Sequence, residues 1–164
     1  MNKIILNILF ILLLASCEQP VEKVRGIPSD ARVEVERPDN ETLEKELNDK
    51  GYQTFLYKEG DSTYLMQQYY IVFLKSGLNR NQDSLTAAKL QDEHMAHMAR
   101  MYEEGYTSLT GPMGDDGDLR GIVIYNTATQ READSLASLD PMVKAGRLEV
   151  EVRPWWVAKG GKLK

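Results

Sequence analysis

Two side chains in this sequence have the types and settings needed to move a proton, namely His94 and Asp140. His94 lies in the stretch Glu93-His94-Met95-Ala96-His97-Met98, and Asp140 directly precedes a proline. An imidazole exchanges protons near neutral pH, and a neighbouring carboxylate can fix its tautomer. The pair predicts acid–base chemistry, with His94 as the acid–base and Asp140 as its orienting partner. A structural hydrogen bond that ties two helices together is the other interpretation of the same pair.

Gly111 and Pro112 are the second candidate feature, because backbone groups near a strand end can polarise a ligand. The same two residues would also serve simply to end a strand. We predict no metal site, since His94 and His97 do not converge and a metal needs three or four ligands. The sequence has no glycine-rich nucleotide loop and no haem-attachment motif, so we predict no cofactor.

The helix that carries His94 is expected to begin at Asp83 or Ser84 and to run to Glu104, where Gly105 stops it. At about 100° per residue, one face of this helix is apolar. His94 is expected at the edge of that face, where it can reach a small pocket between the helix and a sheet. His97 is expected further round, toward solvent. The apolar face itself consists of Met95, Met98, Met101 and Tyr102.

Four apolar segments of the main domain predict strands, around residues 70–74, 106–110, 122–125 and 148–153. A capping box, Thr129-x-x-Glu132, predicts a second helix, which Pro141 is expected to end. The order β-α-β-β-α-β predicts an α+β, ferredoxin-like antiparallel sheet with both helices on one face. The other face, around residues 71–73, 122–124 and 150–152, is left bare. We expect a second copy to cover it, which makes the protein a homodimer.

The residues before this domain, which we place at 67–158, are expected to form separate parts. Residues 40–66 predict a short helix followed by a hairpin. Residues 17–39 contain three prolines and mixed charges, which is typical of an extended tether. Residues 159–164 form a short tail.

Residues 1–16 are typical of a signal peptide, because their apolar run is too short to span a bilayer, which needs about 20 residues. The ending Leu14-Ala15-Ser16-Cys17 resembles the lipobox of bacterial lipoproteins, which implies cleavage before Cys17 and lipid on that residue. An ordinary signal peptide followed by an accidental cysteine is the alternative. The first interpretation places the protein in the cell envelope, anchored on the periplasmic side or in the outer membrane of a bacterium.

Composition limits the possible partners. The net charge is −5, with 42% hydrophobic and 27% charged residues, which indicates a folded acidic protein. No cluster of Lys and Arg is present, so we predict no binding to nucleic acid. A small molecule is the expected ligand.

The order and spacing of several motifs across residues 69–157 resemble the YCII-related (YciI-like) proteins of the dimeric α+β barrel superfamily. The resemblance maps the family's helical histidine onto His94, its aspartate before a proline onto Asp140, and its Gly-Pro onto Gly111 and Pro112. It implies elimination or isomerisation of a small aromatic or lactone-like compound, since a related enzyme dechlorinates a hydroxylated ring. A non-catalytic envelope module that binds a small molecule or a protein is the alternative. The motifs are Leu90-Gln91-Asp92-Glu93-His94-Met95-Ala96-His97-Met98, Glu103-Glu104-Gly105, Leu109-Thr110-Gly111-Pro112, Asp118-Leu119-Arg120-Gly121, Asp140-Pro141, Lys144-Ala145-Gly146-Arg147 and Arg153-Pro154-Trp155.

Overall fold

The computed structural model describes residues 38–163. The predicted leader, Cys17 and most of the tether therefore lie outside the described residues. The described chain folds into four helices and five strands, whose bounds are α1 Asn40–Asp49, β1 Thr54–Glu59, β2 Ser62–Ser76, α2 Ser84–Glu103, β3 Thr107–Pro112, β4 Leu119–Tyr125, α3 Gln130–Ala137, α4 Pro141–Lys144 and β5 Leu148–Ala158.

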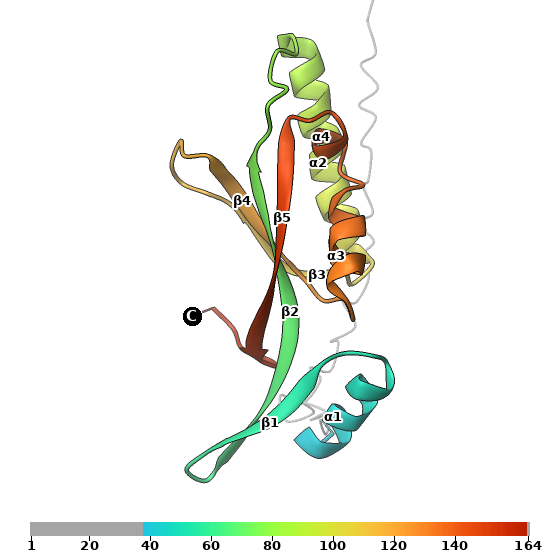
Figure 1. The fold of residues 1–164 in the computed structure, drawn as a ribbon, viewed down its shortest axis with the longest axis vertical. Coiled ribbons are helices and arrows are strands. Elements are labelled where there is room, and N and C mark those ends of the chain that lie inside the picture. The colour runs from blue at the N-terminus through green and yellow to red at the C-terminus, as the bar shows by residue number, and fades with distance from the viewer. Residues whose placement is uncertain (1–37, 164) are drawn as a thin grey trace, which may run out of the picture. The chain divides into compact units, whose positions relative to one another are not determined.

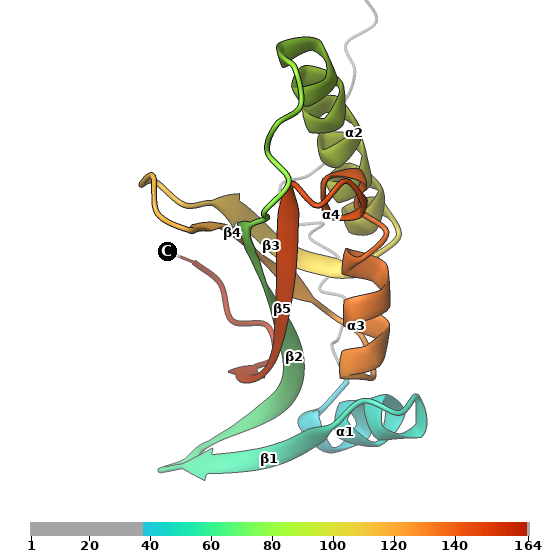
Figure 2. The same cartoon turned by 45° about the horizontal axis from the view of Figure 1, so that its top comes forward.

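The strands form one antiparallel sheet built around β2. Strand β5 pairs with β2 along one edge, β4 pairs with the other edge, and β3 lies outside β4. The hairpin strand β1 pairs with the first part of β2. Helices α2, α3 and α4 lie on the same face of this sheet (Figures 1 and 2). The fold is thus the predicted α+β class, with a ferredoxin-like antiparallel sheet and a preceding helix, α1.

Strand β2 is longer than the sequence predicted. Two strands were expected, one in the hairpin and one at residues 70–74, but β2 is a single strand of 15 residues. Its partners overlap at Met66 and Gln67, where β1 and β5 pair with opposite edges, so the backbone hydrogen bonds continue without a break. The boundary that the sequence predicted between the extension at residues 40–66 and the main domain at residues 67–158 therefore lies inside this strand. The hairpin and the main domain therefore share one sheet.

The hydrophobic core lies between the sheet and the helices. Strand β2 contributes Tyr70, Val72 and Leu74, which alternate with side chains on the open face of the sheet. Val150 and Val152 pack against this core, because they lie opposite Leu74 and Val72. The open face of β5 consequently presents charged residues such as Glu151 rather than the valines. The other buried residues of the core are Met98, Met101, Val123, Tyr125, Ala133, Ala137, Met142 and Leu148.

The helix ends follow the sequence closely. Asp83 caps α2 by accepting the Thr86 N–H at 2.8 Å, and Gly105, with φ of 79°, follows its last turn. Thr129 caps α3 by accepting the Glu132 N–H at 3.2 Å, as the capping box predicted. The end of α3 was predicted wrongly.

Helix α3 ends at Ala137, four residues before Pro141. Pro141 instead begins α4, where it occupies the first turn and its missing N–H removes no helical hydrogen bond. The restraint that proline places on the preceding residue is present, since Asp140 has extended backbone angles, φ −57° and ψ 129°. That conformation makes Asp140 the N-cap of the new helix.

Candidate functional site

Asp140 is fixed by its position at the start of α4. Its Oδ1 accepts the Met142 N–H at 2.8 Å, which satisfies one of the free donors of the helix N-terminus. The residue is buried, with 1% of its surface exposed. A carboxylate this deep needs partners for its remaining lone pairs. The second oxygen, Oδ2, is directed to α2.

His94 on α2 supplies that partner. Its Nδ1 lies 2.5 Å from Oδ2 of Asp140, so the contact predicted between the two residues is present. A carboxylate accepts, so Nδ1 is the nitrogen that carries the proton and Nε2 is left with a free lone pair. The His94 side chain is 13% exposed, which leaves the ring partly accessible from outside the core.

The pair is electrostatically coupled. Burial of Asp140 opposes its ionisation, but its hydrogen bonds with His94 and with the Met142 N–H outweigh this and hold the pKa of Asp140 below its ordinary value. The carboxylate is therefore ionised at neutral pH. An ionised partner is what an imidazole needs to stabilise the positive charge that it gains when it accepts a proton.

His97 does not face solvent, and this expectation was wrong. The residue is 2% exposed, whereas Met95 and Tyr102 are exposed at 56% and 66%. The buried face of α2 is centred on His97, Met98 and Met101, because α4 and the core of the sheet lie on that side. The helical spacing places His94, His97, Met98 and Met101 on one face of α2. The two histidines therefore occupy positions that are usually apolar on such a face.

His97 differs from His94 in its partners. The Arg100 guanidinium donates to its Nδ1 at 3.0 Å, and its buried Nε2 has no hydrogen-bond partner among the described residues. Burial lowers the pKa of His97, and Arg100 and His94 lower it further, against the charge of Asp140. His97 is thus a neutral core residue in the same electrostatic surroundings as the pair.

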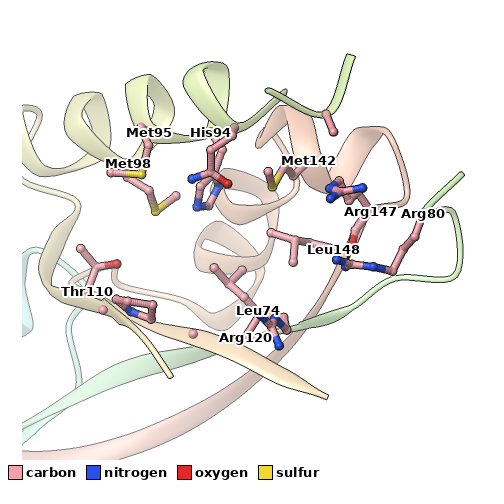
Figure 3. Close-up of a pocket in the computed structure, with 15 residues that line it drawn as sticks. Leu74, Arg80, His94, Met95, Met98, Thr110, Arg120, Met142, Arg147 and Leu148 are labelled. Carbon is pink, nitrogen blue, oxygen red and sulfur yellow. Dashed lines mark hydrogen bonds between the residues drawn. The ribbon is translucent and has the colours of Figure 1, made fainter. Parts of the chain in front are cut away.

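A cavity of about 650 Å³ lies between α2 and the strands. His94, Gly111 and Pro112 all line it, so the structure brings these three predicted residues together, while Asp140 stands behind His94 and does not line the cavity. Figure 3 shows His94 projecting from its helix toward the strands that carry Leu74 and Thr110. Much of the wall is apolar and comes from Leu74, Met95, Met98, Met142 and Leu148.

Three residues of the cavity were missed at the level of sequence, namely Arg80, Arg120 and Arg147. They come from the loop after β2, from β4 and from the turn before β5, so no spacing rule connects them. Arg120 and Arg147 lie in motifs that carry the family resemblance, and that was the available signal.

Within residues 38–163, no group of three or more His, Cys, Asp or Glu side chains is arranged to hold a metal ion. No helix in this described part of the chain is both long and apolar enough to cross a bilayer.

These features define a small α+β domain in which a histidine, backed by a buried carboxylate, faces a cavity. The family model for the YCII-related domain matches residues 75–156, which is half of the chain. The chain therefore belongs to the YCII-related family. The match begins near the end of β2, so α1 and β1 precede it.

No curated protein matches this chain. One similar solved structure is 5-chloro-2-hydroxyhydroquinone dehydrochlorinase from Burkholderia phenoliruptrix AC1100, in complex with 2,5-dihydroxybenzoquinone. It is 21% identical, with a TM-score of 0.40, over 53% of this chain and 92% of that one.

Proposed function

We propose that this YCII-related protein carries out acid–base chemistry, an elimination or an isomerisation, on a small molecule bound in the cavity. The observation that supports the proposal is the arrangement of His94, which contacts the buried Asp140 with one ring nitrogen and borders the cavity with the same side chain. A histidine needed only to join two helices would not have to border a cavity of this size.

In this proposal the free Nε2 of neutral His94 removes a proton from a carbon of the substrate. The electron pair of the broken C–H bond then forms a new double bond. In an elimination a leaving group departs with the electron pair of its bond to carbon. In an isomerisation an existing double bond breaks instead, and its electron pair takes the proton back from the imidazolium at another carbon. Asp140 keeps the proton on Nδ1 before the step and offsets the charge of the imidazolium after it.

Gly111 and Pro112 are proposed to contact the substrate. They end β3 and pair with Ile122 and Gly121 of the neighbouring strand. Gly121 allows close pairing there, because a Cβ at that position would lie 2.9 Å from the carbonyl oxygen of Gly111. This close approach supports a fixed backbone surface opposite His94.

The test is proton exchange. Small aromatic acids and lactones are incubated with the protein in D₂O, and deuterium incorporation or product formation is followed by NMR. Wild type is expected to catalyse exchange or turnover on at least one compound, and folded His94→Gln is expected not to. A compound that binds both proteins in a thermal-shift assay, with no exchange or turnover by wild type, would support the non-catalytic binding module instead.

Anchoring is a separate part of the proposal. The ending Leu14-Ala15-Ser16-Cys17 supports lipid on Cys17 and a place in the cell envelope of a bacterium. Detergent partitioning with mass spectrometry of the mature N-terminus tests this, with Cys17→Ser as the matched control. Wild type is expected in the detergent phase with a lipidated Cys17, and recovery of an unmodified Cys17 in the aqueous phase contradicts it.

A further inference from the structure

Three arginines line the cavity that His94 borders. Arg80 follows β2, Arg120 lies in β4 and Arg147 directly precedes β5. Arg80 and Arg147 are in direct contact, since Nη1 of Arg80 donates to the carbonyl oxygen of Arg147 at 3.2 Å. Figure 3 shows these two on one side of His94 and Thr110 on the other. Segments far apart in the sequence thus bring positive charge to one place.

These charges have no partner among the described residues. No Asp or Glu lines the cavity, and none of the three arginines forms an ion pair within residues 38–163. Elsewhere within residues 38–163, basic residues do form ion pairs with carboxylates, namely Lys45, Lys75, Lys89, Arg100 and Arg153. The chain has 25 acidic and 20 basic residues. A shortage of acidic side chains therefore does not explain why these three arginines form no ion pair in the described region.

The arginines also retain most of their hydrogen-bonding capacity. Each guanidinium makes one hydrogen bond to a neutral acceptor in the described region: Arg147 donates to Oε1 of Gln82 at 2.9 Å, and Arg120 to the Gly117 carbonyl at 3.0 Å. A guanidinium has five N–H donors in a planar fork, which matches the two oxygens of a carboxylate. Like charges held together repel one another, and a bound anion would relieve that repulsion.

The backbone holds two of the arginines in place. Gly77 donates its N–H to the Arg147 carbonyl at 3.0 Å, and Asn79 donates to the Gly146 carbonyl at 3.0 Å. The side chain of Asn79 adds a bond to the Ala145 carbonyl at 2.9 Å. The loop that carries Arg80 is thus fastened to the turn that carries Arg147. A site prepared in this way needs little rearrangement to receive a ligand.

We propose that the cavity binds a small organic acid, with its carboxylate held by Arg80, Arg120 and Arg147. Its apolar body would lie against Leu74, Met98 and Met142. The cavity has the size of an ordinary small-molecule site, and an inorganic anion would contact only its charged side. That the body of the acid presents a reactive C–H to His94 rests on the proposed function, whereas recognition of the carboxylate does not.

The test is equilibrium binding with the full-length chain, which separates this inference from catalysis. Benzoate and phthalate are titrated calorimetrically against the neutral isosteres benzamide and phthalamide, with inorganic phosphate as a third probe. Arg147→Gln and Arg120→Gln remove one charge each, and Arg147→Lys keeps the charge but loses the fork. Arg131→Gln, on the exposed side of α3, is the matched control for net charge.

At least one of the carboxylates is expected to bind wild type at least tenfold more tightly than its neutral isostere. Each Arg→Gln change in the cavity should weaken it by roughly tenfold or more, as expected for a lost charge-assisted hydrogen bond. Arg147→Lys should fall in between, Arg131→Gln should match wild type, and His94→Gln should still bind. Equal binding of acids and neutral isosteres, tighter binding of phosphate than of either acid, or equal effects of Arg131→Gln and Arg147→Gln would each overturn the proposal. If the carboxylates bind as expected but wild type catalyses no exchange, only the proposed function fails.

Discussion

Asp140 binds His94 with one carboxylate oxygen and the start of α4 with the other. Oδ2 lies 2.5 Å from Nδ1 of the imidazole, and Oδ1 accepts the Met142 N–H at 2.8 Å. One buried side chain therefore both positions a helix and sets the tautomer of a histidine on another helix. The two roles can be separated, because different substitutions remove different bonds.

Asp140→Asn tests the tautomer. Asparagine is as good an N-cap as aspartate, so Oδ1 can still accept from Met142 and α4 should remain. The amide nitrogen of the new asparagine is a donor, so it favours the form of His94 in which Nδ1 carries no proton and can accept. The proton of His94 should therefore move to Nε2, and any activity should fall. Nitrogen-15 NMR of the imidazole should show that the protonated and unprotonated ring nitrogens are interchanged relative to wild type.

Asp140→Ala is the control that removes both bonds. It should lower the free energy of unfolding by about 1–3 kcal/mol, because the Met142 N–H loses its acceptor. Asp140→Asn should cost clearly less in the same urea titration. Equal losses of stability for the two variants, with an unchanged His94 tautomer in Asp140→Asn, would show that the pair is only structural.

The contact between His94 and Asp140 could be predicted because each half has a local cause. Pro141 forces extended angles on Asp140, and the helical repeat puts His94 on the inner side of α2. The orientation of His97 could not be predicted, because the sequence around the two histidines does not show which side of α2 will pack against α4. Polar residues were assigned to solvent, and the packing of α4 against α2 overrode that assignment.

The buried His97 predicts how stability depends on pH. Its pKa is lowered in the folded protein, with burial as the main cause, so the unfolded chain binds more protons below the ordinary value of 6.5. The contribution to stability is therefore full above that pH and is lost as the pH falls below it. The groups around His97 are Asp140, which favours its charged form, and Arg100, His94 and Lys144, which oppose it.

Urea titrations between about pH 5 and 8 measure this effect, since that is the range in which histidine changes charge. Wild type should lose stability steadily below pH 6.5, and His97→Met should show a flatter profile. The same variant should not be strongly destabilised at high pH, because it removes a buried Nε2 that has no partner in the described region. Parallel pH profiles for the two proteins would contradict this account.

Gly77 predicts a strict steric requirement next to the cavity. A Cβ at this position would lie 2.2 Å from the carbonyl oxygen of Gly146, which is far inside van der Waals contact. Gly77→Ala should therefore push the turn before β5 away and displace Arg147. We expect a loss of stability of about 1–3 kcal/mol, as for overpacking, together with weaker binding of benzoate.

Gly114→Ala is the matched control, because a Cβ there meets nothing within 4 Å. It should leave both the melting temperature and benzoate binding close to wild type. If Gly77→Ala also has no effect on either measurement, the contact between the two turns does not hold the arginines.

The arginines show where prediction from sequence ends. Capping residues and strand alternation act over a few positions, so the elements could be predicted from neighbouring residues. The approach of Arg80 to Arg147 depends instead on main-chain bonds between residues about 70 positions apart, such as the one from Gly77 to Arg147. No pattern among neighbouring residues predicts that two positions so far apart in the sequence lie side by side in the fold.

The last prediction concerns the open face of the sheet, which we propose a second copy covers. Val72 and Leu74 face the helices, so Phe73 points to the opposite side, beside Ile122 on the neighbouring strand. A stable interface commonly buries about 1,200–2,000 Å² in total, and a charge at its centre is strongly unfavourable. Light scattering should give a dimer mass for wild type and a monomer mass for Phe73→Glu. Leu85→Glu, which alters a residue 85% exposed on α2, should remain a dimer, and a monomeric wild type at micromolar concentration would contradict the proposal.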